Sequence, residues 1–335
     1  MILEVDNTKR TTSISCPRKF QLNYINHIFS LNGSTALRYG SVWHKILEGF
    51  YMTIAAEGWG SLAKAIAVGG KFGHDAWEKE SSKFQFYSDY RTLENLMKGF
   101  IAYLEFYHGD EGLLEVSRTE RVFKILMIPT PFELAKFPGL KPVYFTGQID
   151  LEVELSGRRW IKEHKSTGWY IGKVTQTLQR SPQIVGYNYA SYVLAEDDEL
   201  LDGSLVSVFH TSAYKSKVTG EYGKPKFDFS RVPQVFSVKD LALWRFSYMA
   251  DVYRLQHYYK HNIFPERSHS CYTYGACGYI NICEQNKPVG QEILHGYFVD
   301  DDPWDVLKGK EDRLTVHEDN SKMDMWDQIQ RELLS

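Results

Sequence analysis

Apolar residues recur at helical spacing in the first third of the chain. In residues 40–56 the apolar stripe consists of Val42, Ile46, Gly49 and Phe50. His44 and Glu48 lie four residues apart and share another face of the same predicted helix. Similar spacing predicts a helix over residues 90–108, and a Ser/Thr-rich start predicts another over residues 11–29.

From residue 118 the pattern changes to alternating strands and helices. Strands are predicted over residues 119–128, 143–165 and 204–211, and helices over residues 183–195 and 237–260. The long helix 237–260 opens with Ser237-x-x-Asp240, a variant of the capping box. A polar segment, residues 213–232, is predicted to form a hairpin or a long loop. This order predicts a mixed α/β core with a helical N-terminal elaboration.

The segment 146–165 carries the most information about chemistry. Strand alternation places the polar residues Gln148, Asp150, Glu152 and Glu154 on one face, and the apolar residues Ile149, Leu151, Val153 and Leu155 on the other. A two-residue turn at Ser156-Gly157 would set Asp150 opposite Glu163, with their Cβ atoms about 4.5–5.5 Å apart. Lys165 would project from the same face, whereas a turn shifted by one residue would pair Asp150 with Lys165 instead.

Two carboxylates at that distance repel each other unless a cation lies between them. Together with water and phosphate oxygens they could complete the octahedral shell of Mg²⁺, with the Lys165 ammonium stabilising charge on a phosphoryl group. This arrangement predicts metal-assisted hydrolysis of phosphodiester bonds. The competing interpretation is a solvated hairpin face with alternating charges, and Glu152 and Glu154 are assigned to such a surface.

The same residues resemble the PD-(D/E)XK nuclease motif, in the order Asp150, then Glu163-His164-Lys165. The leading proline is absent, and Gly147-Gln148-Ile149-Asp150 resembles the G-x-x-D form of the RecB-like branch. Two further motifs resemble that branch, in the expected order along the chain: Gly40-x-x-x-His44-x-x-x-Glu48 and Gln183-x-x-x-Tyr187.

The resemblance implies a restriction-endonuclease-like α/β fold, in which a mixed sheet is flanked by helices. It implies that Mg²⁺ or Mn²⁺ is held by His44, Asp150, Glu163 and the main-chain carbonyl of His164. It further implies that catalysis depends on Asp150, Glu163, Lys165, Gln183 and Tyr187. Glu120 precedes a strand where the family often carries an acidic residue, and a role at the site or at the surface is equally compatible with the sequence.

The chain has four cysteines, at positions 16, 271, 277 and 283. Their spacing is not the Cys-x-x-Cys of most zinc sites, and free buried thiols are one interpretation. One cysteine before the core and three after it resemble the iron–sulfur members of the RecB-like branch, including the AddB nuclease domain, the CRISPR adaptation nucleases and exonuclease V. This resemblance implies that Cys16, Cys271, Cys277 and Cys283 bind a [4Fe–4S] cluster, with zinc as the alternative, that clips the C-terminal segment to the N-terminal helix.

Composition and charge fit this interpretation. The chain has 335 residues, 43 % of them hydrophobic and 24 % charged, and a net charge of −3. Residues from Asp300 onward include 11 acidic and 5 basic side chains, so the rest of the chain is slightly basic. The expected organisation is a helical part (1–117), a nuclease core (118–260), a Cys-rich segment (261–299) and an acidic tail (300–335).

No apolar run is long enough for a membrane span, and the N-terminus lacks a signal-peptide pattern, so we expect a cytoplasmic protein of a bacterium or a phage-infected cell. The expected substrate is DNA. Candidate phosphate contacts are Lys173, Arg180, Lys215 and Lys217, although a flexible solvated hairpin would explain the last two equally well.

The predicted function is a metal-dependent exonuclease that acts on DNA ends or single strands in recombination, repair or phage DNA processing. An endonuclease or flap nuclease with the same chemistry, and a non-catalytic nucleic-acid-binding scaffold, are the alternatives. Because no G-x-x-x-x-G-K-[ST] motif occurs, the chain would act alone or beside a separate helicase or recombination partner.

Overall fold

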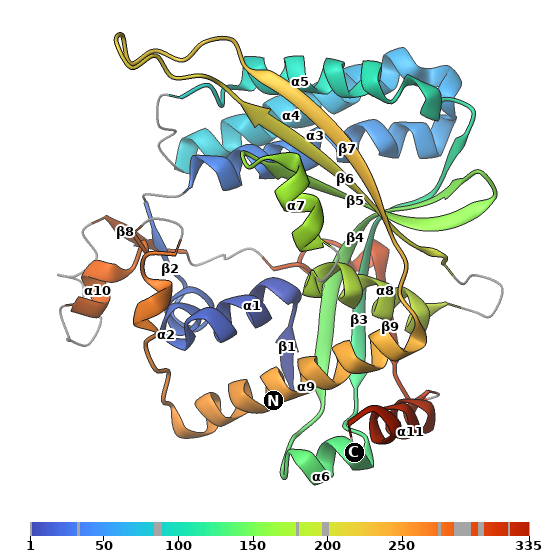
Figure 1. The fold of residues 1–335 in the computed structure, drawn as a ribbon, viewed down its shortest axis with the longest axis vertical. Helices are drawn as coiled ribbons and strands as arrows, with labels where there is room; N and C mark the ends of the chain where they lie inside the picture. The colour runs from blue at the N-terminus through green and yellow to red at the C-terminus, as the bar shows by residue number, and fades with distance from the viewer. Residues whose placement is uncertain are drawn as a thin grey trace.

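The fold is built on a seven-stranded mixed sheet (Figure 1). The computed structural model describes residues 2–31, 34–83, 89–178, 181–195, 201–273, 276–284, 296–300, 305–320 and 322–334. The strands are β1 (Leu3–Val5), β3 (Leu114–Met127), β4 (Val143–Leu155), β5 (Arg158–Thr167), β6 (Gly203–Ser212), β7 (Lys226–Gln234) and β9 (Leu314–Glu318). Their order is β7-β6-β5-β4-β3-β9, and β1 pairs with β4. The pairs β3–β4, β4–β5 and β6–β7 are antiparallel, and the pairs β5–β6, β3–β9 and β1–β4 are parallel.

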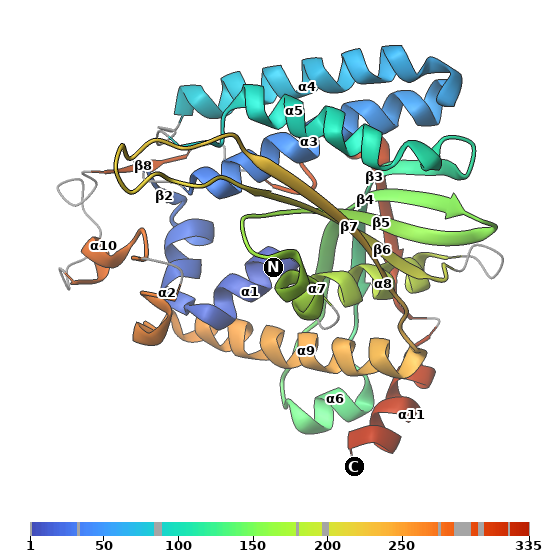
Figure 2. The same cartoon turned by 45° about the horizontal axis from the view of Figure 1, so that its top comes forward.

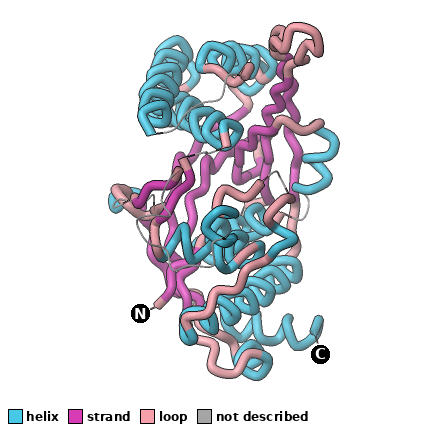
Figure 3. Tube along the Cα trace, turned by 90° about the vertical axis from the view of Figure 1, so that its left-hand side faces the viewer, coloured by secondary structure: helices cyan, strands magenta, loops and turns pink. Residues whose placement is uncertain are grey.

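Helices cover both faces of this sheet (Figures 2 and 3). One face carries α3 (Thr35–Glu57), α4 (Leu62–Lys83) and α5 (Leu93–Phe106), and the other carries α8 (Pro182–Leu194) and α9 (Val238–His261). The shorter helices are α1 (Asn7–Ser15), α2 (Pro17–Phe20), α6 (Pro131–Lys136), α7 (Ile171–Leu178), α10 (Ile280–Glu284) and α11 (Met323–Leu334). Each face has its own large buried apolar cluster. The predicted mixed sheet flanked by helices is therefore confirmed.

The predicted helices begin and end at somewhat different residues in the structure. The helix expected over residues 11–29 is interrupted at Cys16, whose extended backbone (φ −158°) separates α1 from α2. Helix α4, which packs closely on α3, was not predicted from the sequence. A Cβ atom at Gly73 would lie 2.4 Å from Ile46 Cγ1, so the glycines that weaken the helical signal are what allow the close packing.

The register of the β4–β5 hairpin is the one that the Ser156-Gly157 turn predicts. Pairing runs from Leu155 with Arg158 to Leu151 with Lys162. Ser156 and Gly157 have φ values of 55° and 72°, as a two-residue hairpin turn of type I′ requires.

The predicted alternation of side chains along β4 is confirmed for the apolar residues from Leu151 to Leu155 and is wrong at Ile149. Ile149 packs in the cluster beneath α8 and α9, whereas Leu151 and Val153 pack beneath α3. The regular pairing is interrupted at Asp150, which has a register partner in neither β3 nor β5. Glu152 is also not a solvated side chain, because it is 7 % exposed and accepts a hydrogen bond of 2.8 Å from Arg121 Nη1.

The chain after residue 260 contributes to the sheet and to its cover. A small two-stranded sheet joins β2 (Ile28–Ser30) to β8 (Tyr297–Val299), so an early and a late segment of the chain meet there. Farther on, β9 extends the main sheet beside β3, and α11 packs near α6 and α9 (Figure 1). Within the described residues, none of the helices is both long and apolar enough to pass through a membrane.

Candidate active site

His44 reaches the sheet because α3 approaches β5 closely. A Cβ atom on Gly40, one turn before His44, would lie 2.7 Å from the Ser166 Oγ atom. Glycine at this position therefore lets the helix lie against the strand. His44 Nδ1 is then 3.4 Å from Asp150 Oδ2. This contact gives a physical reason for the Gly40-x-x-x-His44 spacing.

At Asp150, hydrogen bonds between main chain and side chains replace the regular pairing of β4 with β5. The main-chain N–H of His164 donates a hydrogen bond of 2.9 Å to Asp150 Oδ2. The main-chain N–H of Asp150 donates a longer one, 3.4 Å, to Glu163 Oε1. The imidazole Nδ1 of His164 also lies 3.6 Å from Asp150 Oδ2. The two carboxylates are thus held side by side at the point where β4 and β5 separate.

Lys165 and the first turns of α8 complete this group. Lys165 Nζ lies 3.5 Å from Glu163 Oε2 and donates a hydrogen bond of 2.9 Å to Gln183 Oε1. Gln183 Nε2 in turn donates to the Tyr187 hydroxyl at 3.1 Å. A Cβ on Gly147 would lie 3.0 Å from the Tyr187 ring, so the glycine gives the ring room to reach this place. Six predicted residues therefore lie together: His44, Asp150, Glu163, Lys165, Gln183 and Tyr187.

The two carboxylates have opposite shifts in pKa. Burial works against a charged Asp150, but His44 and the hydrogen bonds from His164 hold the pKa of Asp150 well below its usual range. Burial, and then repulsion from Asp150, raise the pKa of Glu163 to about 8. Burial lowers the pKa of His164 to about 4. At neutral pH the pair therefore carries one negative charge more readily than two.

The carboxylate oxygens of Asp150 and Glu163 are the kind of ligand that a hard divalent cation binds. Carboxylate oxygens are the ligands that Mg²⁺ prefers, and a cation between Asp150 and Glu163 would remove the repulsion that raises the pKa of Glu163. As the side chains stand in the part of the chain that the structure describes, no group of three or more His, Cys, Asp or Glu is arranged to hold a metal ion.

A buried ionic cluster behind the hairpin was not predicted from the sequence. Lys162 is fully buried, donates a hydrogen bond of 2.6 Å to the Tyr51 hydroxyl and lies 3.6 Å from Asp110 Oδ2. Asp110 accepts two hydrogen bonds, of 2.9 and 2.6 Å, from Arg231. The Tyr51 ring stacks on His164, with ring centroids 5.7 Å apart. Alternation could have indicated that Lys162 points away from Glu163, but not which residues surround it.

Two cations from the C-terminal segment also reach the rim of the site. Lys310 Nζ donates a hydrogen bond to Gln148 Oε1, and Arg313 Nη1 lies 3.9 Å from Glu48 Oε1. Glu120 is 7 % exposed and faces this group, so the structure favours the site over the surface for Glu120. No local signal in the sequence connects residues 310–313 with residues near 120.

The four cysteines come from the two ends of the chain and are free thiols. Ser270 Oγ donates a hydrogen bond of 2.6 Å to the main-chain oxygen of Ser15, which brings the segment before Cys271 against Cys16. Burial raises the pKa of Cys271, and the nearby Cys277 and Cys16 raise it further. Burial and Glu266 raise the pKa of Cys283 to about 12. The cysteine side chains are thus close enough to affect one another's pKa.

The predicted phosphate contacts are dispersed. Lys173, on α7, lies over the Trp169 ring at 4.2 Å from its centroid. Lys215 and Lys217 are exposed in the connection between β6 and β7, which extends past the ends of α3 and α5 (Figure 1). Arg180 lies outside the described residues.

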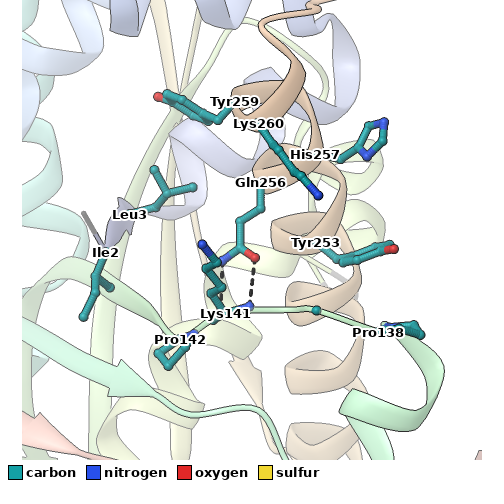
Figure 4. A pocket seen from close by; sticks show the side chains of 11 residues that line it. Ile2, Leu3, Pro138, Lys141, Pro142, Tyr253, Gln256, His257, Tyr259 and Lys260 are labelled. Carbon is teal, nitrogen blue, oxygen red and sulfur yellow. Dashed lines mark hydrogen bonds between the residues drawn. The ribbon is translucent and has the colours of Figure 1, made fainter.

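A separate hollow of about 610 Å³ lies between β1, the segment before β4 and α9 (Figure 4). Its wall includes Lys141, Tyr253 and His257, and Gln256 is tied to the main chain of Lys141 by two hydrogen bonds of 2.9 Å. Of the predicted site residues that the structure describes, none lines this hollow. It is therefore distinct from the group around Asp150.

Comparison with known proteins gives one family. No curated protein matches the sequence. The model of the PD-(D/E)XK nuclease superfamily matches residues 8–284, which include all four sequence motifs and the strands of the main sheet from β3 to β7. With this match over most of its length, the chain belongs to the PD-(D/E)XK nuclease superfamily.

Proposed function

We propose that this protein is a Mg²⁺- or Mn²⁺-dependent DNA exonuclease that acts on DNA ends or single strands. The observation that carries the proposal is the grouping of Asp150, Glu163 and Lys165 at the divergence of β4 and β5, with Gln183 bonded to Lys165. A protein that used this fold only as a scaffold would have no need for two adjoining carboxylates, one buried and one half-buried, which are costly to keep together.

Each residue has a distinct part in the proposed reaction. Asp150, Glu163, His44 and the main-chain carbonyl of His164 would hold the metal ion, after a small rearrangement that brings their donor atoms together. When bound, the ion supplies Lewis-acid stabilisation of the phosphoryl oxygens and lowers the pKa of a coordinated water. Lys165 would place its ammonium beside the negative charge that develops on the scissile phosphate. Gln183 and Tyr187 would fix the direction of that ammonium.

A digestion assay on linear DNA tests this proposal. Wild-type protein with Mn²⁺ should release nucleotides from end-labelled DNA, whereas Asp150→Asn and Lys165→Ala should not. Lys98→Gln is a suitable control, because it removes a lysine that only pairs with Glu94 on the exposed face of α5. If metal-loaded wild-type protein degrades no nucleic acid, the enzymatic proposal fails and the scaffold alternative gains support.

The same assay separates exonuclease from endonuclease activity. An exonuclease should leave covalently closed circular DNA intact and degrade the same molecule after linearisation. Cleavage of the closed circle would establish the endonuclease or flap-nuclease alternative. Labels on the 5′ or the 3′ end then give the direction of degradation.

We also propose that Cys16, Cys271, Cys277 and Cys283 bind a [4Fe–4S] cluster. The approach of the Cys271 segment to Ser15 and the mutual effects among the thiols support a shared ligand. Such a cluster would stabilise the contact between the two ends of the chain, because binding to four thiolates favours the folded state. Anaerobically purified protein should be brown and Cys277→Ala colourless. A colourless protein with one zinc per chain would indicate the zinc alternative.

The remaining expectations concern the substrate and partners. Lys173 is the best placed of the predicted phosphate contacts, because it lies on α7, which directly follows β5. Arg180, Lys215 and Lys217 complete the proposed DNA-contact set. A role in recombination, repair or phage DNA processing, in the cytoplasm and beside a separate helicase, would agree with this activity.

A further inference from the structure

The hollow beside α9 lies between two walls that are held together (Figure 4). Its volume of about 610 Å³ is in the usual range for sites that bind small molecules. One wall is a face of α9, and the other consists of β1 and the segment before β4. The main-chain N–H of Lys141 donates a hydrogen bond of 2.9 Å to Gln256 Oε1, and Gln256 Nε2 donates one of 2.9 Å to the Lys141 carbonyl. This pair of bonds fixes the distance between the walls.

Two tyrosine rings in the hollow are fixed by aromatic side chains next to them. The Tyr253 ring packs on Phe137, with ring centroids 5.5 Å apart. The Tyr259 ring meets Phe20 and Phe264 edge-on, with centroids 6.2 and 5.6 Å apart. Both tyrosines are only partly buried, so part of each remains accessible from the hollow. Rings that are already held in place lose little conformational freedom when a flat ligand stacks on them.

Cationic side chains line the same hollow. Lys141, His257 and Lys260 are exposed there, and Figure 4 shows His257 and Lys260 projecting from α9. The lining residues that the structure describes include no carboxylate. Within the described part of the chain, neither Lys141 nor Lys260 takes part in an ion pair.

The carboxylates on the two walls are neutralised by other residues. Glu4, on β1, is bonded to Lys124. Asp251, on α9, accepts a hydrogen bond of 2.8 Å from Arg10 Nε. The positive charge around the hollow is therefore not cancelled by these carboxylates, and it favours an anionic ligand.

A flat ring joined to a phosphate matches both features of the hollow. Proteins that bind single-stranded nucleic acids stack bases on aromatic side chains and hold phosphates with basic ones. An alkyl chain would stay partly in water here, because the cationic lining residues are exposed and the hollow is open. An acidic peptide would pair with the lysines but would have no need for two fixed rings. The combination therefore favours a nucleotide.

We propose that this hollow binds a nucleotide, with its base against the tyrosine rings and its phosphate at Lys141 and Lys260. The ligand is either a free nucleoside monophosphate or one nucleotide of a DNA strand, since the two share this chemistry. Pro142, in the wall, comes eight residues before Asp150 along β4, which corresponds to about 26 Å of strand. The hollow is thus a second site, and its ligand does not depend on the proposed catalytic activity.

Photocrosslinking tests the proposal, because irradiated 5-iododeoxyuridine bonds covalently to an aromatic side chain that stacks on it. The full-length Asp150→Asn protein, purified anaerobically, keeps DNA intact and leaves the hollow unchanged. It is irradiated with 5-iododeoxyuridine monophosphate, or with a thymidine oligonucleotide that carries the same base. Mass spectrometry of the peptides should place the label on Tyr253 or Tyr259. Labelling by the free nucleotide identifies that source, and labelling by the oligonucleotide alone identifies a DNA strand.

Charge variants in the same background test the phosphate contact. Isothermal titration calorimetry with the monophosphate should give a Kd roughly tenfold weaker for Lys260→Gln and nearly unchanged for Lys260→Arg, because arginine keeps the charge. Lys141→Gln combined with Lys260→Gln should weaken binding further. Lys98→Gln is the control, since it removes an exposed ammonium on α5, outside the hollow, and should bind as tightly as its parent.

Four results would each overturn the proposal. Deoxyribose 5-phosphate, which lacks the base, would bind as tightly as the monophosphate. The label would lie only outside the hollow. The double lysine variant would keep the Kd of its parent. Dodecanoate or a hexaglutamate peptide would displace the nucleotide at a lower concentration than thymidine monophosphate does.

A tyrosine variant adds a direct test of stacking. Tyr253→Leu combined with Tyr259→Leu should lose the label, and retention of a label within the hollow would contradict the stacking. If this variant does not melt cooperatively, the labelled positions in the parent protein and the lysine variants, which change only exposed side chains, decide.

The outcomes also separate this inference from the proposed function. Wild-type protein that degrades DNA, together with no label in the hollow, would defeat only the nucleotide site. A label in the hollow, together with wild-type protein that degrades no DNA, would defeat only the proposed function.

Discussion

Lys165 Nζ lies 2.9 Å from Gln183 Oε1, and this hydrogen bond joins β5 to the first turn of α8. The same ammonium is 3.5 Å from Glu163 Oε2, so the amide and the carboxylate fix it from two sides. Because Gln183 also donates to the Tyr187 hydroxyl, the direction of the lysine depends on how α8 packs against the sheet.

Gln183→Ala should lower kcat by roughly 10–100-fold, as is usual when a group that orients a site residue is removed. Lys165→Ala should lower it further, by about 10²–10³-fold, because the charge itself is lost. Steady-state kinetics on linear DNA with Mn²⁺ would measure both. Gln328→Ala is the control, since Gln328 makes a comparable bond to Glu332 on the exposed side of α11. Equal activity of Gln183→Ala and wild type would contradict the orienting role.

Glu163→Gln should abolish activity and change how the stability of the metal-free protein depends on pH. The pKa of Glu163 is raised to about 8, so the folded protein holds a proton that the unfolded chain releases near pH 4.5. This contribution to stability is fully present below pH 4.5 and is lost as the pH rises through 8. Urea unfolding with chelator should therefore show that the free energy of unfolding of Glu163→Gln increases relative to that of wild type as the pH rises from 4.5 to 8. If the stability of wild type and of Glu163→Gln depends on pH in the same way, the pKa of Glu163 is not raised.

Asp110→Asn should destabilise the protein by about 3–5 kcal/mol, because it leaves the buried Lys162 and the half-buried Arg231 without a carboxylate. Lys162→Met should cost much less, since it removes a buried charge and leaves Asp110 paired with Arg231. Urea unfolding monitored by circular dichroism gives both values. Asp75→Asn, which breaks an exposed pair with Lys71, should change stability by less than about 1 kcal/mol. If Asp110→Asn and Asp75→Asn lower the free energy of unfolding by similar amounts, the buried cluster does not contribute to stability as stated.

Ser156→Asn should stabilise the protein by about 0.5–1 kcal/mol, because asparagine accepts the left-handed backbone at the first turn position more readily than serine. Gly157→Ala should destabilise it by about 1–2 kcal/mol, since alanine is strained at a φ of 72°. Thermal unfolding measures both changes. Opposite signs from those stated would indicate a different turn.

Much of the fold was predictable because its signals are local. The helical stripe of residues 40–56 and the turn at Ser156-Gly157 depend on neighbours within a few residues, and so does the register that follows from the turn. The order of the four motifs can be read directly from the sequence. Helix α4 was missed because its glycines weaken the helical pattern, and their value appears only when α3 packs against them.

The grouping of the predicted residues needed contacts between distant parts of the chain. The irregularity of β4 at Asp150 is invisible to a rule of strict alternation, and it explains why Ile149 and Leu151 pack on opposite sides of the sheet. The burial of Lys162 depends on α3 and on β7.

The amino-acid order alone determined the hairpin and the motif set, since side-chain identity and short-range spacing suffice for these. Only the tertiary structure decided that Glu120 and Lys310 belong to the same site. Their proximity results from the pairing of β9 with β3, a long-range contact whose partners carry no mutual signal in the sequence.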